Sequence, residues 1–81
     1  MSLLSDNIIP GNYGKLFGTN TVEEQDLLYI KKRILEIDGV KRVEINNTVF
    51  PREFTVYTSK IVAVVDIENL VKLIGFNAIP Q

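Results

Sequence analysis

Residues 21–45 decide the fold, and they read TVEEQDLLYIKKRILEIDGVKRVEI. Thr21 and Glu24 have the spacing of a capping box, in which each side chain bonds the backbone N–H of the other residue. Glu23 and Asp26 add negative charge near the same point, where the dipole of a helix start favours it. This pattern predicts an amphipathic helix that begins at Thr21.

An apolar stripe runs along this predicted helix, and a glycine follows it. Gly39 is the natural residue for a left-handed C-terminal cap. Residues 40–45 then alternate broadly between apolar and charged side chains, as in a half-buried strand. A helix that turns directly into a strand needs a sheet to cover its apolar side. The stripe consists of Val22, Leu27, Ile30, Ile34 and Ile37.

The length and composition suit one small domain. The chain has 81 residues, of which 46% are hydrophobic, enough for a core. We expect a flexible leader over residues 1–12 and a single domain over residues 13–81. The net charge of −1 and the pI near 5.3 give no overall attraction to nucleic acid.

Two residue types are missing, and their absence excludes several kinds of chemistry. The sequence contains no cysteine and no histidine. Disulfides, thiolate chemistry and imidazole ligands or bases are therefore excluded. No apolar run is long enough to span a bilayer, and the first residues lack the pattern of a signal peptide. We expect a cytoplasmic protein with no cofactor and no membrane association.

The rest of the chain supplies three further strands and one further helix. Residues 13–19, 54–58 and 77–79 predict strands, and residues 64–74 predict a helix that ends before Gly75. The helix start is open, because Asp66 could also cap it. The order βαββαβ predicts an α+β fold of the ferredoxin-like kind, a four-stranded antiparallel sheet with two helices on one face. The second apolar stripe consists of Ile67, Leu70, Val71 and Ile74.

Several of these segments resemble the heavy-metal-associated domain family of copper chaperones and metal-ATPase modules. The similarity covers about residues 13–80. It is best in ILEIDGV at 34–40, VEIN at 43–46 and IENLVKLIGFNA at 67–78. The resemblance implies the same fold, with a G-M-T-C-x-x-C loop after the first strand whose two thiolates hold Cu(I) or Zn(II).

The metal loop is where this sequence departs from the family. Gly18-Thr19-Asn20-Thr21 stands in place of G-M-T-C. Aligned on the glycine, Thr21 and Glu24 take the cysteine positions; aligned backward from Gly39, Glu23 and Asp26 take them. Neither alignment supplies a thiolate, so the metal function does not carry over. The degenerate metal-loop positions are Thr19, Asn20, Thr21, Glu23 and Asp26.

Glu23, Glu24 and Asp26 allow two interpretations. They could form a site for a hard cation, or they could complement the helix dipole and its cap. We expect the second, because hard cations need several converging oxygen atoms and neighbours along a helix diverge.

Three aromatic residues are predicted on the open face of the sheet. In the register of the family, Leu16 faces the helices and Phe17 faces away, together with Tyr13 and Tyr57. This surface could contact a protein, could stack on bases as RNA-binding sheets do, or could be partly covered by the leader. The acidic pI opposes the nucleic-acid interpretation.

The run VFPREF at 49–54 is the most distinctive loop. Phe50 could be an exposed anchor flanked by Arg52, or it could tuck under the hairpin, which is the arrangement we expect. No residues form a recognisable catalytic motif, so we do not expect an enzyme. The sequence favours a non-catalytic binding or adaptor domain with a protein partner or as a homodimer. The alternative is metal binding or transport through ligands other than cysteine.

Overall fold

The computed structural model describes residues 7–81 and contains six strands and two complete helices in that range. The helices are α2 (Glu24–Ile34) and α3 (Val64–Leu73). The strands are β1 (Ile8–Ile9), β2 (Gly14–Thr19), β3 (Val40–Asn46), β4 (Arg52–Thr58), β5 (Val62–Ala63) and β6 (Ala78–Pro80).

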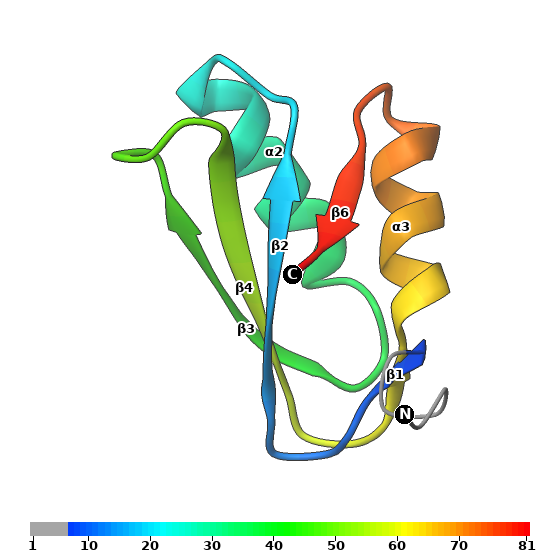
Figure 1. The fold of residues 1–81 in the computed structure, drawn as a ribbon. Helices are drawn as coiled ribbons and strands as arrows, with labels where there is room; N and C mark the ends of the chain where they lie inside the picture. The colour runs from blue at the N-terminus through cyan, green and yellow to red at the C-terminus, as the bar shows by residue number, and fades with distance from the viewer. Residues whose placement is uncertain (1–6) are drawn as a thin grey trace.

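The strands form two separate sheets. Four of them make an antiparallel sheet in the order β3-β4-β2-β6, and β1 pairs with β5 in a small antiparallel ribbon. The two helices contact each other and lie against the same side of the larger sheet (Figure 1). The predicted α+β class, with two helices and a four-stranded antiparallel sheet, is confirmed. The β1–β5 ribbon was not predicted, because two-residue strands leave almost no pattern in a sequence.

The ribbon packs part of the predicted leader against the domain, at Ile8 and Ile9. Ile9 of β1 is fully buried in the core, and Thr58 Oγ1 at the end of β4 donates a hydrogen bond to the Pro10 carbonyl at 2.5 Å. Residues 8–10 therefore belong to the folded domain. The part of the predicted leader over residues 1–6 lies outside the described residues.

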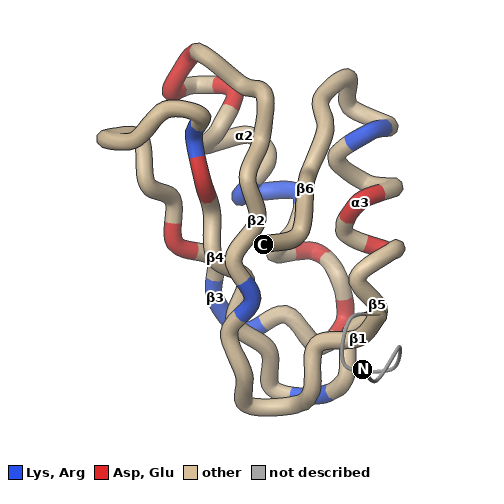
Figure 2. Tube along the Cα trace, viewed as in Figure 1, with Lys and Arg blue, Asp and Glu red and all other residues tan. Residues whose placement is uncertain are grey.

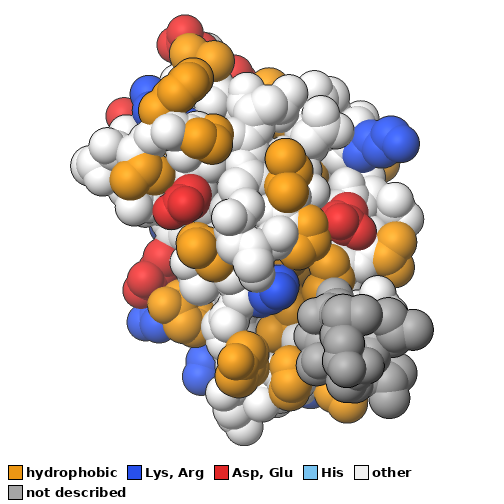
Figure 3. Space-filling model, viewed as in Figure 1, with side chains coloured by type: hydrophobic (Ala, Val, Ile, Leu, Met, Phe, Trp, Pro, Cys, Tyr) orange, Lys and Arg blue, Asp and Glu red, His pale blue; other side chains and the backbone are white. Residues whose placement is uncertain are grey.

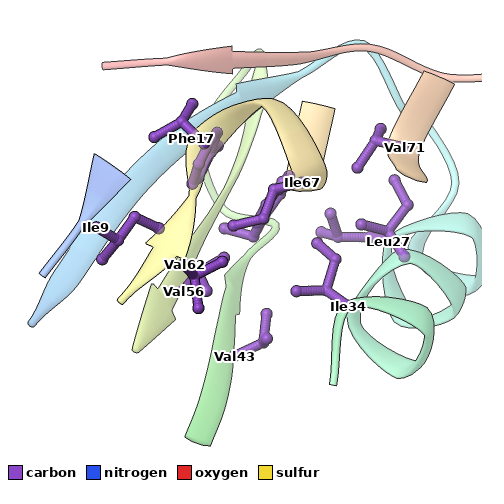
Figure 4. Packing of buried hydrophobic residues seen from close by; sticks show 12 residues of the cluster. Ile9, Phe17, Leu27, Ile34, Val43, Val56, Val62, Ile67 and Val71 are labelled. Atoms are coloured by element: carbon purple, nitrogen blue, oxygen red, sulfur yellow. The ribbon is translucent and has the colours of Figure 1, made fainter. Parts of the chain in front are cut away.

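One hydrophobic cluster joins both helices to both sheets. Phe17 of β2 and Phe54 of β4 are stacked at its centre, with ring centroids 5.3 Å apart. Side chains from the strands and the helices point toward one another in Figure 4. The buried members are Ile9, Phe17, Leu27, Ile30, Ile34, Val43, Phe54, Val56, Val62, Val64, Ile67 and Val71.

The start and the end of α2 differ from the prediction. The N-cap is Glu23 rather than Thr21, and no side chain bonds the cap. The predicted capping box is wrong, because Thr21 turns inward and is buried. The helix ends at Ile34, before the predicted stop, and a turn leads to Gly39. The left-handed conformation predicted for Gly39 is confirmed, with φ of 98°.

The end of α3 matches its prediction closely. Gly75 adopts φ of 101°, and its N–H donates to the Lys72 carbonyl at 3.0 Å. The Phe76 N–H reaches back to the Val71 carbonyl at 3.0 Å, which completes a Schellman motif. The helix begins at Val64, so Asp66 lies in its first turn and is not the cap.

No helix in the described part of the chain combines the length and the apolar character that a bilayer crossing needs.

Candidate functional site

The segment that would be the metal loop is closed and tied to the rest of the fold. Thr19 and Thr21 are only 2% and 1% exposed, and neither hydroxyl has a hydrogen-bond partner among residues 7–81. The Asn20 side-chain oxygen accepts a hydrogen bond from the Asn77 N–H at 2.8 Å. This bond fastens the loop after β2 to the segment before β6, so the loop is part of the scaffold.

The acidic residues of this region do not converge. Glu23 is the exposed N-cap of α2, and Asp26 is a half-buried residue in the first turn. Within residues 7–81, no three or more Asp, Glu, His or Cys side chains come together as a metal ion would require. Their position at the helix start fits the expected interaction with the helix dipole.

The predicted face of β2 is wrong by one residue. Phe17 is fully buried and pairs in register with Phe54, whereas Leu16 is 37% exposed and pairs with Thr55. Cross-strand partners lie on the same face of a sheet, so the inward direction predicted for Phe54 requires Phe17 to point inward too. A shift of one residue exchanges the two faces of a strand. Phe17 is therefore absent from the open face.

Tyr57 does lie on the open face, but both sides of its ring are covered. A Cβ atom on Gly14, its register partner, would lie 2.7 Å from the ring, so the ring packs directly on that backbone. The Arg42 guanidinium lies over the ring, 4.2 Å from the centroid. The Tyr57 hydroxyl donates a hydrogen bond to the Glu44 carboxylate at 3.4 Å. These two contacts reduce the ring surface on which a base could stack.

Tyr13 is brought close to Tyr57 around a shallow hollow of about 510 Å³. Tyr13 is 57% exposed and lies just before β2, outside the regular strand. Lys41 and Arg42 line the same hollow, and Figure 2 shows basic residues along this part of β2 and β3. Hydrophobic side chains form mostly separate groups on the face shown in Figure 3. Among the described residues, the open face of the sheet around this hollow is therefore mixed in character, with aromatic and basic side chains side by side.

Among the described residues, the most exposed large hydrophobic side chain belongs to Phe50, in the loop between β3 and β4. Phe50 is 79% exposed, so the expected arrangement in which it tucks under the hairpin is wrong. Val49 and Val22 are exposed on either side of the same arginine. We call these four residues, Val22, Val49, Phe50 and Arg52, the hairpin-tip surface.

Arg52 holds this surface in place. Its guanidinium donates to the Val49 carbonyl at 3.0 Å and to the Val22 carbonyl at 3.4 Å. It also lies 5.9 Å from the centroid of the Phe50 ring. The Arg52 Nε atom is buried and has no hydrogen-bond partner in the part of the chain that the structure describes. One side chain thus connects the β3–β4 hairpin to the segment before α2.

Val22 is the member of this surface that sequence reasoning missed. We predicted that it begins the buried stripe of the first helix, but the helix begins after it. Its side chain therefore does not follow the helical stripe and remains in solvent. Had the capping box at Thr21 not been assumed, Val22 could have been placed before the helix. Nothing in the local sequence links Val22 to Arg52.

A second small network lies on the outer surface of α2. The Arg33 guanidinium donates to the Tyr29 hydroxyl at 3.2 Å and to Glu36 at 3.1 Å. These contacts, with the hydrogen bond to Tyr29 as the largest cause, raise the pKa of Arg33 above its usual value. The Arg33 side chain is partly exposed, and its guanidinium stays charged.

Comparison of the chain with protein-family models, with curated proteins and with solved structures gave no match.

Proposed function

We propose that this domain is a non-catalytic protein-binding module whose contact point is the hairpin-tip surface. The observation that carries the proposal is the 79% exposure of Phe50 on a loop that Arg52 braces at two carbonyl groups. Burying a phenylalanine side chain contributes about 1.5–3 kcal/mol. Binding energy concentrates in such aromatic anchors, especially beside an arginine.

The brace favours this loop over other exposed apolar residues. A loop that must be ordered on binding loses affinity through its conformational entropy. Arg52 already fixes Val49 and Val22 around Phe50, so the cost of ordering the surface is reduced. Leu73 is equally exposed at 78%, but it lies at the end of α3 with no comparable bracing contact among the described residues.

We further propose that the architecture is ferredoxin-like and related to heavy-metal-associated domains. Support comes from the two split β-α-β units, in which β4 separates β2 from β3, and β2 separates β4 from β6. The β1–β5 ribbon is an addition to that plan. The kinship itself rests on the sequence motifs in residues 34–40 and 67–78 and stays a prediction, as does the absence of the family's metal chemistry.

A photo-crosslinking experiment tests the binding function. A photoreactive phenylalanine analogue is placed at position 50 in one variant and at position 73 in another, and each is irradiated in extract of the source cells. We expect a discrete crosslinked protein with the position-50 variant alone. That protein, once purified, should bind the unmodified chain and bind Phe50→Ala about tenfold or more weakly, because the aromatic anchor is lost.

Leu73→Ala is the matched control, since it removes an equally exposed apolar side chain elsewhere. Equal crosslinking at both positions would show that exposure alone drives the contact. Unchanged binding by Phe50→Ala would assign the interaction to another surface. Either result would refute the proposal.

A further inference from the structure

We propose that two copies of this chain associate through β3, with antiparallel strand pairing centred on Val43. In the described structure β3 pairs with β4 along one edge, and its other edge has no partner strand. The backbone N–H and C=O groups of a free edge are a ready template for another strand. This association is independent of the hairpin-tip surface.

Symmetry limits the possible registers. In an antiparallel pair, residues opposite each other lie on the same face of the sheet. A two-fold axis perpendicular to the sheet must therefore lie midway between one residue and the same residue of the partner subunit, so that this residue faces its own copy. The central choices in β3 are Arg42, Val43 and Glu44.

Charge selects one of these three registers. Centring on Arg42 would place that cation opposite itself, and centring on Glu44 would place that carboxylate opposite itself. Centring on Val43 places each Arg42 opposite Glu44 of the partner subunit, twice per dimer. Opposite charges in directly facing positions stabilise a strand pair, and like charges destabilise it. The sequence around Val43 is thus complementary to itself.

Both side chains are exposed enough to reach a second copy, and each also contacts Tyr57. The Arg42 and Glu44 side chains are 58% and 55% exposed and form a contact of 3.5 Å within the chain. An exposed ion pair contributes little to stability, so exchanging it for a pair with the partner subunit costs little. The backbone groups of the free edge gain new hydrogen bonds in the same step.

The helical side of the sheet supports the same arrangement. The proposed axis keeps the helices of both copies on one face of a continuous sheet. The only strand against which α2 makes extensive contact is β3. Leu28 of α2 and Leu35, the C-cap residue of that helix, are exposed. A second copy paired at this edge would lie next to α2, the helix that contacts β3.

Two features limit the strength of the pairing. A β-bulge lies between Val40 and Arg42, and the exposed Lys41 is the residue at the bulge. Natural proteins use bulges and lysines to restrain edge strands. In β3 the bulge and Lys41 leave the regular segment from Arg42 onward for pairing. We therefore expect a dimer of modest affinity that forms at high concentration.

Charge reversal provides the test. Arg42→Glu and Glu44→Arg each place like charges opposite one another across the proposed axis. Each single variant should therefore associate about tenfold or more weakly than the unmodified chain. An equimolar mixture of the two should form a heterodimer, because every facing pair then has opposite charge. The double variant R42E/E44R should recover the homodimer.

Sedimentation velocity and native mass spectrometry on the full chain, up to millimolar concentration, measure the association of each sample. The samples are the unmodified chain, the two single variants, their mixture and the double variant. Lys72→Glu on α3 is the control for a charge change far from β3, and circular dichroism checks that each variant is folded. A monomer at every concentration would overturn the proposal. So would a mixture that associates no better than the single variants. Phe50→Ala should leave the dimer unchanged, which separates this result from the binding function.

Discussion

At the scale of single residues, buried threonine hydroxyls differ in what they contact. Thr58 Oγ1 donates to the Pro10 carbonyl and accepts the Tyr13 N–H at 3.4 Å. Thr19 and Thr21 are equally buried, but their hydroxyls have no partner in the described structure. A buried polar group without a hydrogen bond destabilises a fold, whereas a bonded one contributes to it.

Valine substitutions should therefore have opposite effects at these positions. Thr58→Val should lower the free energy of unfolding by about 1–3 kcal/mol, because it leaves the Pro10 carbonyl without its donor. Thr21→Val should leave that free energy unchanged or raise it by up to about 1 kcal/mol. Urea unfolding of each variant measures both values. An equal loss in the two variants would mean that the Thr21 hydroxyl has a partner after all.

The same residues show where sequence reasoning fails at this scale. The spacing of Thr21 and Glu24 fits a capping box, and nothing local contradicts it. Thr21 is instead drawn inward by the packing of the loop after β2. The left-handed glycines were predictable, because Gly39 and Gly75 follow the apolar stripes and a positive φ favours glycine over every other residue.

At the scale of elements, the face of β2 decides which side chains form the core. Phe17→Ala should lower the free energy of unfolding by about 3–5 kcal/mol, because it removes a fully buried ring stacked on Phe54. Leu16→Ala should cost about 1 kcal/mol or less, because Leu16 lies on the open face. Chemical denaturation compares the two variants. A larger loss for Leu16→Ala would restore the face that the sequence analysis predicted.

Strands and helices were predictable here to different degrees. The alternation in residues 40–45 and 54–58 predicts β3 and β4, and the three- and four-residue spacing of apolar side chains predicts both helices. Which side chains of β2 face the core was not predictable from its own residues, since Gly14 and Gly18 interrupt the alternation. Its register with Phe54 fixes that direction, and register is a contact between distant segments.

At the scale of the whole molecule, a single core should produce a single unfolding transition. The buried cluster takes side chains from both helices and from every described strand except the edge strand β6, which contributes Ala78 at its margin. No element can leave without exposing the shared core, so we expect two-state behaviour. Urea curves followed by circular dichroism and by tyrosine fluorescence should coincide. Two separate midpoints would indicate that the β1–β5 ribbon or a helix unfolds on its own.

The candidate site was less predictable than the fold because it depends on side-chain placement. Phe50 and Arg52 were named from the sequence, but their exposure and their contact with Val22 arise from the folded arrangement. Tyr13 and Tyr57 were named too, yet Arg42 and Gly14 occupy the ring faces that made Tyr57 interesting. Composition identifies candidate residues, and packing decides which surfaces remain free.

Arg52 also joins parts of the chain that are 30 residues apart, through its bond to the Val22 carbonyl. Because one planar guanidinium contacts both Val49 in the hairpin and Val22 before α2, a displacement of the hairpin tip also displaces the start of α2. We therefore expect a partner bound at Phe50 to change the amide hydrogen-exchange rates in the first turn of α2 without contacting that turn.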